Sequence, residues 1–443
     1  MSRNASGVLH RDLARAPTAI LRGDGVWLEA EDGRRYLDGS ASASVVSIGH
    51  GRTEIWDALA AEGDRVTFVS AMTFTHPWQE QLAAELLRLA PANMAAAYFV
   101  SGGSEANETA WKIARQYHVE TGKPQKYKAI ARSQSYHGTT LATLSLSGRT
   151  SWRRMYSPLL LDVPHVAPPY RYRCAFCAGA PQCSLACADD LERAILMEGP
   201  ETVAAFFAEP VVGTTAAGLV PSADYYRRIR EICDRNDVLF VADEVLCGYG
   251  RTGTAFAMEH FGVVPDIVTM GKGLAGGYAP LGAVLVSEGI KEALAGGSAR
   301  LNHVLTFSGM PSATFVGLKV NEIMRREGLF DRAAETGPIL RRGLERLALE
   351  HEIVGEVRGL GLLQGVEFVA DRRTRRPFAR EARVTDRIVS GLRDRGVIVA
   401  AGTPLSNHGR DGDHIQISPP LIIGEDEIAH VVGALDDVLD ELA

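Results

Sequence analysis

Six short apolar runs, separated by longer stretches with helical periodicity, constrain the fold of this chain more than any other feature. The runs are AAAYFV (95–100), YKAIA (127–131), VAAFFA (203–208), VLFVA (238–242), DIVTM (266–270) and GAVLVS (282–287). Their length and their Val, Ile and aromatic content predict buried strands. Because strands that are apolar on both faces need helices on both sides, the alternation predicts an α/β fold with a mainly parallel sheet.

The two ends of the chain differ from this middle part, for which we predict a large domain at residues 61–325. Residues 1–60 contain GVWLEAEDGRRYLDG, which predicts a hairpin with its turn at Asp32-Gly33. Residues 326–443 combine a long amphipathic helix, strands such as GLLQGVEFV and a C-terminal helix, which is typical of a smaller α+β domain. More than one domain suits a chain of 443 residues, since a single core rarely grows so large.

Composition and charge argue against several functional classes. The net charge of −7 gives no reason to expect binding to nucleic acid or to an anionic membrane. No apolar run is long enough to cross a bilayer, and charged residues interrupt the N-terminal segment, so we expect no signal peptide. Six cysteines in so long a chain do not make a disulfide scaffold. We therefore expect a cytoplasmic protein.

One lysine stands in unusually open surroundings. The stretch TMGKGLAGGY (269–278) places Lys272 directly after a predicted strand, with a glycine on each side. A surface lysine needs no such clearance, whereas glycine lets the backbone approach a bound group closely. We therefore expect Lys272 to be buried against something flat or bulky.

Two other strand ends carry candidate binding groups. In YFVSGGSEANETAWKIARQ (98–116), backbone N–H groups at Gly103 and Ser104 begin a helix and could hold an anion. The alternative is that Ser104 caps this helix, with Asn107 or Glu108 in its first turn. In SYHGTT (135–140), Tyr136 or His137 could stack on a planar ligand, and packing in the core is the alternative.

A further strand ends in a buried acid. VLFVADEVLCGYGRTG (238–253) carries Asp243 where α/β folds place ligands, although it could also cap the next turn. A phosphate cradle, a stacking ring, an acid and Lys272 thus fall at one edge of the predicted sheet. Pyridoxal 5′-phosphate requires all four: its aldehyde forms a Schiff base with a lysine, its ring nitrogen pairs with an acid, and its phosphate takes N–H donors.

The chain resembles the class III pyridoxal-phosphate aminotransferases of fold type I. The segments SGGSEANE, YHG, EPVVG, ADEVLCGYGRTG, GKGLAGGYAPLGAV, LTFSGMP and ISPPLII occur in the family's order, and the resemblance covers about residues 18–440. It implies a large domain around the sheet and a smaller domain built from both termini. It also implies an enzyme that moves an amino group from an amine donor to an oxo-acid acceptor.

The resemblance implies roles for single residues around the cofactor. Gly103 and Ser104 would hold the phosphate. Tyr136 and Val245 would cover the two faces of the ring, and we expect His137, beside Tyr136, to belong to the same cofactor site.

Other family positions carry the chemistry and the assembly. Asp243 would pair with the ring nitrogen, and Lys272 would be both the Schiff-base lysine and the proton carrier. Thr306 resembles a threonine that reaches the phosphate of the neighbouring subunit's cofactor. This implies a homodimer, or a dimer-based tetramer, with active sites at the subunit interface. Glu209, before Pro210, resembles a structural acid near the site, and its role is left open.

The substrate-binding positions depart from one branch of the family. Members that use glutamate or 2-oxoglutarate have a Glu and an Arg that form a gate for the α-carboxylate. Here these positions hold Thr214 and Gln416, and Leu246 replaces a Gln. The departures resemble the branch that transfers amines or ω-amino acids to pyruvate with the help of a mobile arginine. Arg410 is the candidate for this arginine, and a solvated loop residue is the alternative.

Further residues are expected to shape the substrate pocket. Ser44, in GSASASVV, stands where several relatives have a large aromatic residue, which predicts a roomier pocket. We expect Met72 and Phe74 to line the same pocket. The sequence does not identify the donor.

Four of the six cysteines lie close together in the sequence, in CAFCAGAPQCSLAC (174–187). Cys174, Cys177, Cys183 and Cys187 suggest zinc, but the spacing C-x2-C-x5-C-x3-C is compact for a tetrahedral site. We expect free thiols in an insertion at the edge of the active site, and no metal. Zinc stays the alternative.

The sequence thus predicts a transaminase that works by a ping-pong Schiff-base mechanism, with pyruvate as the expected acceptor. Lys272 and Asp243 would equally serve an aminomutase, epimerase or decarboxylase of the same fold. A pyridoxal-phosphate-binding regulator is the alternative from another class. It would need a nucleic-acid-binding module, of which the sequence shows no sign.

Overall fold

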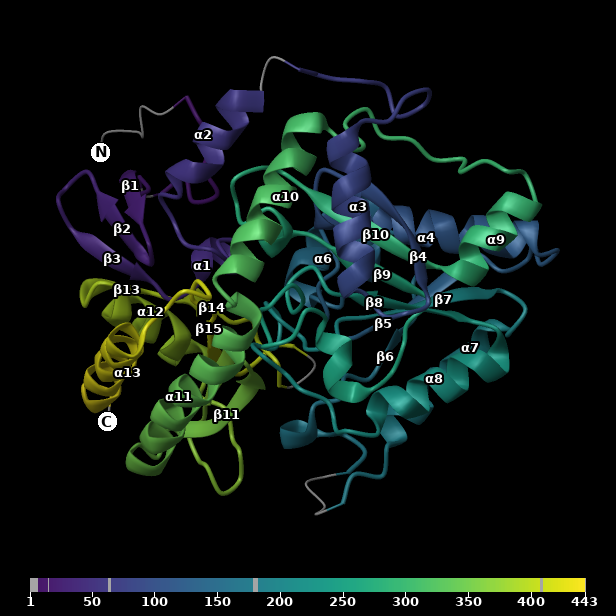
Figure 1. Cartoon of the computed structure of the whole chain (residues 1–443). Coiled ribbons are helices and arrows are strands. Elements are labelled where there is room, and N and C mark those ends of the chain that lie inside the picture. Colours follow the sequence, from purple (N-terminus) through teal and green to yellow (C-terminus); the bar gives the residue numbers. More distant parts are fainter. Residues whose placement is uncertain (1–6, 15, 63–64, 178–181, 407–408, 443) are drawn as a thin grey trace.

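A seven-stranded sheet forms the centre of the protein (Figure 1). The computed structural model describes residues 7–14, 16–62, 65–177, 182–406 and 409–442. The strand order is β4-β10-β9-β8-β7-β5-β6. The strands are Met94–Val100 (β4), Lys128–Arg132 (β5), His165–Val166 (β6), Val203–Ala208 (β7), Leu239–Asp243 (β8), Ile267–Met270 (β9) and Gly282–Ser287 (β10).

The prediction of a mainly parallel sheet is confirmed. The pairs β5–β6, β5–β7, β7–β8 and β8–β9 are parallel, whereas β10 runs antiparallel to both of its neighbours, β4 and β9. Every strand except β10 therefore points the same way. Consequently the carboxyl ends of β4, β5, β8 and β9 lie on one edge of the sheet, where α/β folds place ligands.

Alternation along single strands explains why helices cover both faces. Ala205 and Phe207 of β7 pack with the apolar side of α4 (Gly103–Glu120). Phe206, the residue between them, packs on the opposite face with α8 (Tyr225–Asn236). Because successive side chains of a strand point to opposite faces, a strand that is apolar throughout requires both layers.

Further helices surround this core. None of the helices that the structure describes is both long and apolar enough to span a membrane. The helices not named elsewhere in this section are α2 (Thr53–Glu62), α3 (Pro77–Leu89), α5 (Leu141–Leu146), α6 (Thr150–Tyr156), α7 (Ala186–Glu198), α9 (Glu288–Gly296) and α10 (Pro311–Arg326).

Both ends of the chain build the smaller α+β domain, as predicted (Figure 1). One sheet has the order β1-β2-β3-β13, in which β3 pairs in parallel with β13 from the far end of the sequence. A second sheet has the order β11-β12-β15-β14, and α11 and α12 pack against its strands while α13 contacts both of these helices. The boundaries at residues 60 and 325 stay a prediction. The elements are β1 (Ile20–Asp24), β2 (Trp27–Ala30), β3 (Arg35–Asp38), α11 (Leu329–Glu350), β11 (Val354–Leu360), β12 (Leu363–Phe368), α12 (Val384–Asp394), β13 (Val397–Ile398), β14 (Ala400–Ala401), β15 (Asp413–Ile417) and α13 (Glu425–Asp440).

A buried carboxylate holds the turn that follows β3. The residues of α1 (Ala41–Ser44) all have positive φ, between 44° and 73°, which costs about 1–2 kcal/mol per residue in L-amino acids. Asp38 offsets this cost, because its Oδ1 accepts from the backbone N–H groups of Ser40 (3.3 Å) and Ser42 (3.0 Å), and its Oδ2 lies 3.0 Å from His50 Nε2. Burial alone would raise the pKa of Asp38, but hydrogen bonds from His50, Ser42 and Ser40 outweigh it and lower the pKa.

We expect Asp38→Asn to destabilise the protein by about 1–3 kcal/mol at pH 7, because the turn loses a charged acceptor. The pKa of the folded state is lowered, so this stabilisation is present above the unfolded pKa of about 3.9 and is lost as the pH falls through the folded value. Thermal melting from pH 7 to pH 3 should show the difference between wild type and variant shrinking. Asp57→Asn, at an exposed position on α2, is the control. Equal melting of all three proteins at pH 7 would contradict the assignment.

Candidate active site

A cavity of about 140 Å³ lies at the edge where β4, β5, β8 and β9 end. It brings together seven of the eight residues that the sequence assigned to the cofactor, all except Thr306, and these seven come from four separate segments. The lining residues are Gly103, Ser104, Asn107, Tyr136, His137, Gly138, Glu209, Asp243, Val245, Leu246 and Lys272.

Lys272 enters this cavity from a strained position. It follows β9 after Gly271, begins a short 3₁₀ turn and has φ +44°. Non-glycine residues with positive φ are uncommon and gather at functional sites. Burial lowers the pKa of the Lys272 amine, although the carboxylates of Asp243 and Glu209 oppose the shift. A lowered pKa leaves more of the amine neutral near pH 7, the form that acts as nucleophile and base.

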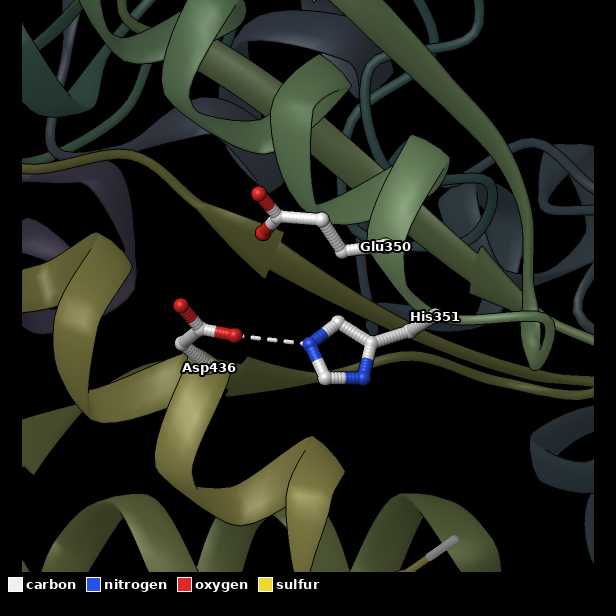
Figure 2. Close-up of side chains that lie close together, drawn as sticks. All are labelled: Glu350, His351 and Asp436. Carbon is white, nitrogen blue, oxygen red and sulfur yellow. Dashed lines mark hydrogen bonds and ion pairs between the residues drawn. The ribbon is translucent and has the colours of Figure 1, made fainter.

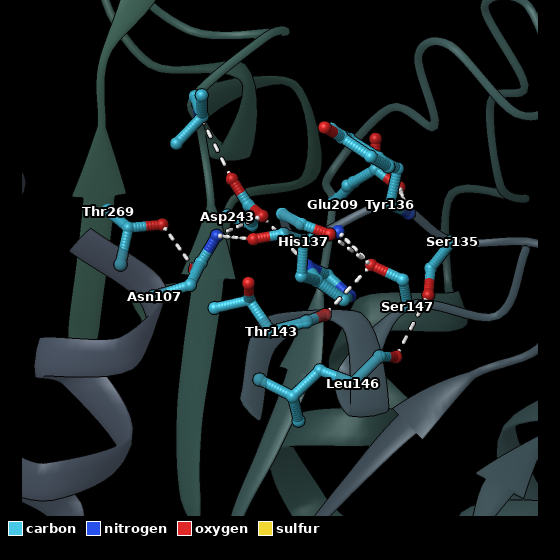
Figure 3. A network of polar contacts seen from close by, with 12 residues as sticks. Asn107, Ser135, Tyr136, His137, Thr143, Leu146, Ser147, Glu209, Asp243 and Thr269 are labelled. Carbon is cyan, nitrogen blue, oxygen red and sulfur yellow. Dashed lines mark hydrogen bonds and ion pairs between the residues drawn. The ribbon is translucent and has the colours of Figure 1, made fainter. Parts of the chain in front are cut away.

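Asp243 is the centre of the polar network in Figure 3. Its Oδ2 accepts a hydrogen bond from Asn107 Nδ2 at 2.7 Å and lies 2.7 Å from His137 Nδ1, and its Oδ1 accepts from the Val245 N–H at 3.1 Å. Asp243, Asn107 and His137 are all buried. An isolated carboxylate would be costly at this depth, and these hydrogen bonds offset that cost.

Asn107 joins three elements of the site, as Figure 3 shows. Besides Asp243, its amide donates to the carbonyl of His137 (2.9 Å) and accepts from the Thr269 hydroxyl (2.9 Å). Thr269 belongs to β9, directly before the turn that carries Lys272. The sequence suggested Asn107 only as part of a helix start. Its position one turn after Gly103, on the same face of α4, was the available signal.

The start of α4 forms a close-fitting wall. A Cβ at Gly103 would lie 2.6 Å from Val245 Cγ1, so only glycine allows this approach. Gly138 has φ +138°, and a Cβ there would lie 2.5 Å from the Ser104 hydroxyl. The first N–H groups of a helix lack intrahelical partners and attract anions. The glycines therefore keep the start of α4 accessible to a bound group.

Glu209, whose role the sequence left open, fixes the loop that carries Tyr136. Its Oε1 accepts from the Tyr136 N–H (2.9 Å) and its Oε2 from the Gly213 N–H (3.0 Å). Burial raises the pKa of Glu209 above its ordinary value. The ring of Tyr136 meets Trp152 edge to face, with centroids 5.8 Å apart. Both contacts hold the aromatic ring at the cavity wall.

Five residues assigned from the sequence do not line this cavity within one chain. Met72 and Phe74 are 77 % and 64 % exposed, and Thr306 is also exposed. Arg410 is exposed and borders a second, larger cavity. Ser44 is buried, where its hydroxyl lies 2.8 Å from Ser418 Oγ. The roles of all five stay predictions.

The cysteines of the insertion are free thiols in the structure. The Cys177 N–H approaches Cys174 Sγ at 3.4 Å, and the Ser184 N–H approaches Cys177 Sγ at 3.5 Å. Hydrogen bonds from Ser184 lower the pKa of Cys177 to about 7, whereas burial raises that of Cys187 to about 12. Among the described residues, which omit 178–181, no three of these sulfur atoms lie mutually within 4.8 Å. The zinc alternative stays open.

One other cluster has the residue types of a metal site (Figure 2). The ligand atoms of Glu350, His351 and Asp436 lie within 4.8 Å of one another, and His351 Nε2 is 2.7 Å from Asp436 Oδ1. Arg346 pairs with both carboxylates, Glu350 and Asp436. Since this guanidinium already supplies positive charge, the cluster is explained as an ion-pair network between α11 and α13.

The Lys272 cavity fits pyridoxal 5′-phosphate. The glycine-lined start of α4 suits a phosphate, and Lys272 supplies a partly desolvated amine. Asp243 Oδ1 has one described hydrogen-bond partner, the Val245 N–H, which leaves it able to accept from a ring nitrogen. Tyr136 and Val245 provide two walls for a planar ring. In addition, His137 Nε2 is buried without a hydrogen-bond partner among the described residues.

Comparison with known proteins gives matches along nearly the whole chain. Residues 9–439 match the family model for class-III aminotransferases. A putrescine–pyruvate aminotransferase of Pseudomonas aeruginosa is 35% identical over 96% of this chain and 91% of its own length. A diaminobutyrate–2-oxoglutarate transaminase of Halomonas elongata is 34% identical over 98% of this chain and 92% of its own. The crystal structure of an amine transaminase from an uncultivated Pseudomonas species, bound to pyridoxal phosphate, has a TM-score of 0.92, 35% identity and 100% coverage of both chains.

These matches agree with the sheet topology and with the chemistry of the Lys272 cavity. The family depends on pyridoxal 5′-phosphate, which is therefore the cofactor of this enzyme. The fold is fold type I, with the smaller domain made from both termini. The chain belongs to the class III aminotransferase family.

Proposed function

We propose that this aminotransferase takes amino groups from amines or ω-amino acids and passes them to pyruvate in a ping-pong reaction. The observation that carries the proposal is the uncharged cluster at the position of the missing gate arginine. Gln416 is buried, and its side-chain amide donates to the hydroxyls of Ser44 and Ser418, each at 3.1 Å. Position 416 therefore offers no fixed guanidinium that could bind the α-carboxylate of a substrate. A donor without an α-carboxylate leaves no charge buried and unpaired beside such groups.

Thr214 supports the same choice of substrates. It stands where the gate would need a glutamate to neutralise the arginine when no α-carboxylate is bound, and it is half-buried. The two relatives named above act with different acceptors, pyruvate in one case and 2-oxoglutarate in the other. The choice of pyruvate therefore rests on Thr214 and Gln416.

We assign the chemical roles to residues of the Lys272 cavity. When bound, pyridoxal phosphate supplies an aldehyde that takes up the donor's amino group and a ring that withdraws electrons from the donor carbon. Asp243 would hold the ring nitrogen in its protonated state, supported by Asn107 and His137. Lys272, with its lowered pKa, would accept the proton from the donor carbon and deliver it again. Tyr136 and Val245 would exclude water from the two ring faces.

Two variants separate the roles of Lys272 and Asp243. Lys272→Ala should lose almost all turnover, because nucleophile and proton carrier are one group. Asp243→Asn should still bind the cofactor but lose most of kcat, since a neutral amide does not keep the ring nitrogen protonated. Borohydride reduction followed by peptide mapping should attach the cofactor to Lys272 in the wild type. Labelling of another lysine, such as Lys112, would refute the first role, and a normal kcat for Asp243→Asn would refute the second.

We also propose that a second copy of this chain completes the active site. Two segments carry exposed apolar side chains, one at residues 66–74 and one at residues 304–307, which includes Thr306. The rings of Phe68 and Phe307 lie 6.3 Å apart, so the two segments are neighbours. A large exposed apolar patch marks an interaction surface. A partner packed there would bring Thr306 towards its cofactor. The exposed apolar residues of the two segments are Val66, Phe68, Met72, Phe74, Val304 and Phe307.

Phe307→Asp should weaken the dimer by placing a charge in this surface. Sedimentation velocity should show a dimer for the wild type and a larger share of monomer for the variant, together with weaker cofactor binding. Leu349→Asp, at an exposed apolar position on α11, is the matched control and should stay dimeric. A monomeric, fully active wild type would contradict the proposal.

The acceptor is tested with Arg410. We expect the wild type to prefer pyruvate over 2-oxoglutarate and ω-amino acids or amines over glutamate. Arg410→Ala should raise KM for pyruvate by about ten- to a hundredfold, because the carboxylate loses one charged hydrogen-bonding partner. The same variant should change KM for a carboxylate-free amine much less. Arg342→Ala, at an exposed site on α11, is the control. A preference for glutamate with 2-oxoglutarate would reject the proposed substrates, and unchanged constants in Arg410→Ala would reject only the role of Arg410.

A further inference from the structure

A second cavity of about 990 Å³ lies next to the catalytic one. The loop after β5 contributes to both, since Gln134 lines the larger cavity and Tyr136 the smaller. The other walls of the larger cavity come from α6, from the segment that follows β6 and from the loop before β15. It is far larger than the Lys272 cavity and has the size of a site for a small organic molecule.

The charge of this cavity is one-sided. Five arginines line it, and no carboxylate does among the residues that the structure describes. This contrasts with the chain as a whole, which carries a net charge of −7. Such a concentration of positive charge focuses the electrostatic potential in the cavity and attracts anions. The five are Arg153, Arg154, Arg173, Arg380 and Arg410.

Three of these arginines have acids nearby. Arg173 Nε lies 2.7 Å from Glu367 Oε1, so its charge is compensated. Arg380 and Arg410 also border a neighbouring cavity of about 500 Å³, whose lining includes acids such as Glu381. These three arginines line the cavity, but acids lie near each of them, so their charges do not themselves require an anionic ligand.

Arg153 and Arg154 are different. In the described part of the chain, neither side chain takes part in an ion pair, and neither guanidinium has a hydrogen-bond acceptor. Arg154 is exposed, but Arg153 is half-buried, and its Nε is fully enclosed without an acceptor. An arginine out of water normally has a counter-charge, because desolvating the guanidinium is costly.

Burial and the charge of Arg153 both affect the ionisable groups of this cavity. Burial lowers the pKa of Arg153 below its ordinary value. Burial together with the charge of Arg153 lowers the pKa of His165, another lining residue, to about 4, so this ring is neutral at pH 7. Apolar walls such as Tyr170 and Leu405 strengthen electrostatic attraction inside the cavity by reducing the local dielectric response.

We propose that this cavity is a binding site for small organic anions that carry two or more carboxylate or phosphate groups. Arg153 and Arg154 hold one anionic group at the wall formed by α6. The remaining volume, with Arg380 at its rim, accommodates the rest of the molecule. The site is separate from the Lys272 cavity, so the inference does not depend on which donor or acceptor the enzyme uses.

The test measures anion binding to the holoenzyme, in which the cofactor already occupies its own phosphate site. Isothermal titration calorimetry with citrate and with pyrophosphate should show saturable binding of at least one of them. The melting temperature should rise with the concentration of that anion, since a ligand that binds the folded state stabilises it. The stronger of the two identifies carboxylate or phosphate as the preferred group.

Variants locate the binding. The double variant Arg153→Met, Arg154→Met keeps apolar stems of similar length and should weaken binding at least tenfold, whereas Arg153→Lys with Arg154→Lys should retain most of it. Arg342→Met removes one charge from an exposed residue that does not line the cavity and should bind as the wild type does. Turnover of saturating donor and acceptor checks that each variant is folded. If the double variant is unstable, Arg154→Met alone, at an exposed position, provides the same test.

Three results would overturn the proposal. The first is the absence of saturable binding of both anions. The second is equal binding by the wild type and the double methionine variant. The third is strictly competitive inhibition against the amine donor, since this would place the anion in the Lys272 cavity instead.

Discussion

The contact between Asp243 and its two buried partners, Asn107 and His137, is the constraint on which the site depends. A carboxylate is stable at this depth only if hydrogen-bond donors arrive from separate elements, here from α4 and from the loop after β5. Those elements meet because β4, β5, β8 and β9 point in one direction and end on one edge. The same edge receives Lys272 from β9. Fold and chemistry are thus linked through one carboxylate.

Much of this arrangement could be predicted because its signals are local. The six apolar runs became strands nearly residue for residue, since burial on both faces excludes polar side chains. Lys272, Asp243 and Tyr136 could be found because each follows such a run directly. Strand direction is a different matter. Nothing in the apolar pattern of β10 indicates that it runs antiparallel to its neighbours, because direction depends on the connections and not on side-chain periodicity.

Features that depend on distant parts of the chain, or on another chain, were harder to predict. The short segment after β3 is composed of Ala and Ser, which suggests nothing unusual, yet it is left-handed because Asp38 and His50 hold it. Ser44 then faces Ser418, from the other end of the sequence. Met72 and Phe74 lie on the outer surface of a single chain, so their relation to any substrate depends on what packs against them.

The parallel pairing of β3 with β13 has a consequence for how the protein is made. Val397 leaves the ribosome roughly 360 residues after Leu37, with which it pairs, and at about 5–20 residues per second this takes roughly 20–70 s. Throughout this interval the edge of β3 lacks its partner strand and is open to pairing with other nascent chains. The central sheet is complete earlier, when β10 emerges. The small domain is therefore the last part to fold, and early termination of synthesis would leave it incomplete.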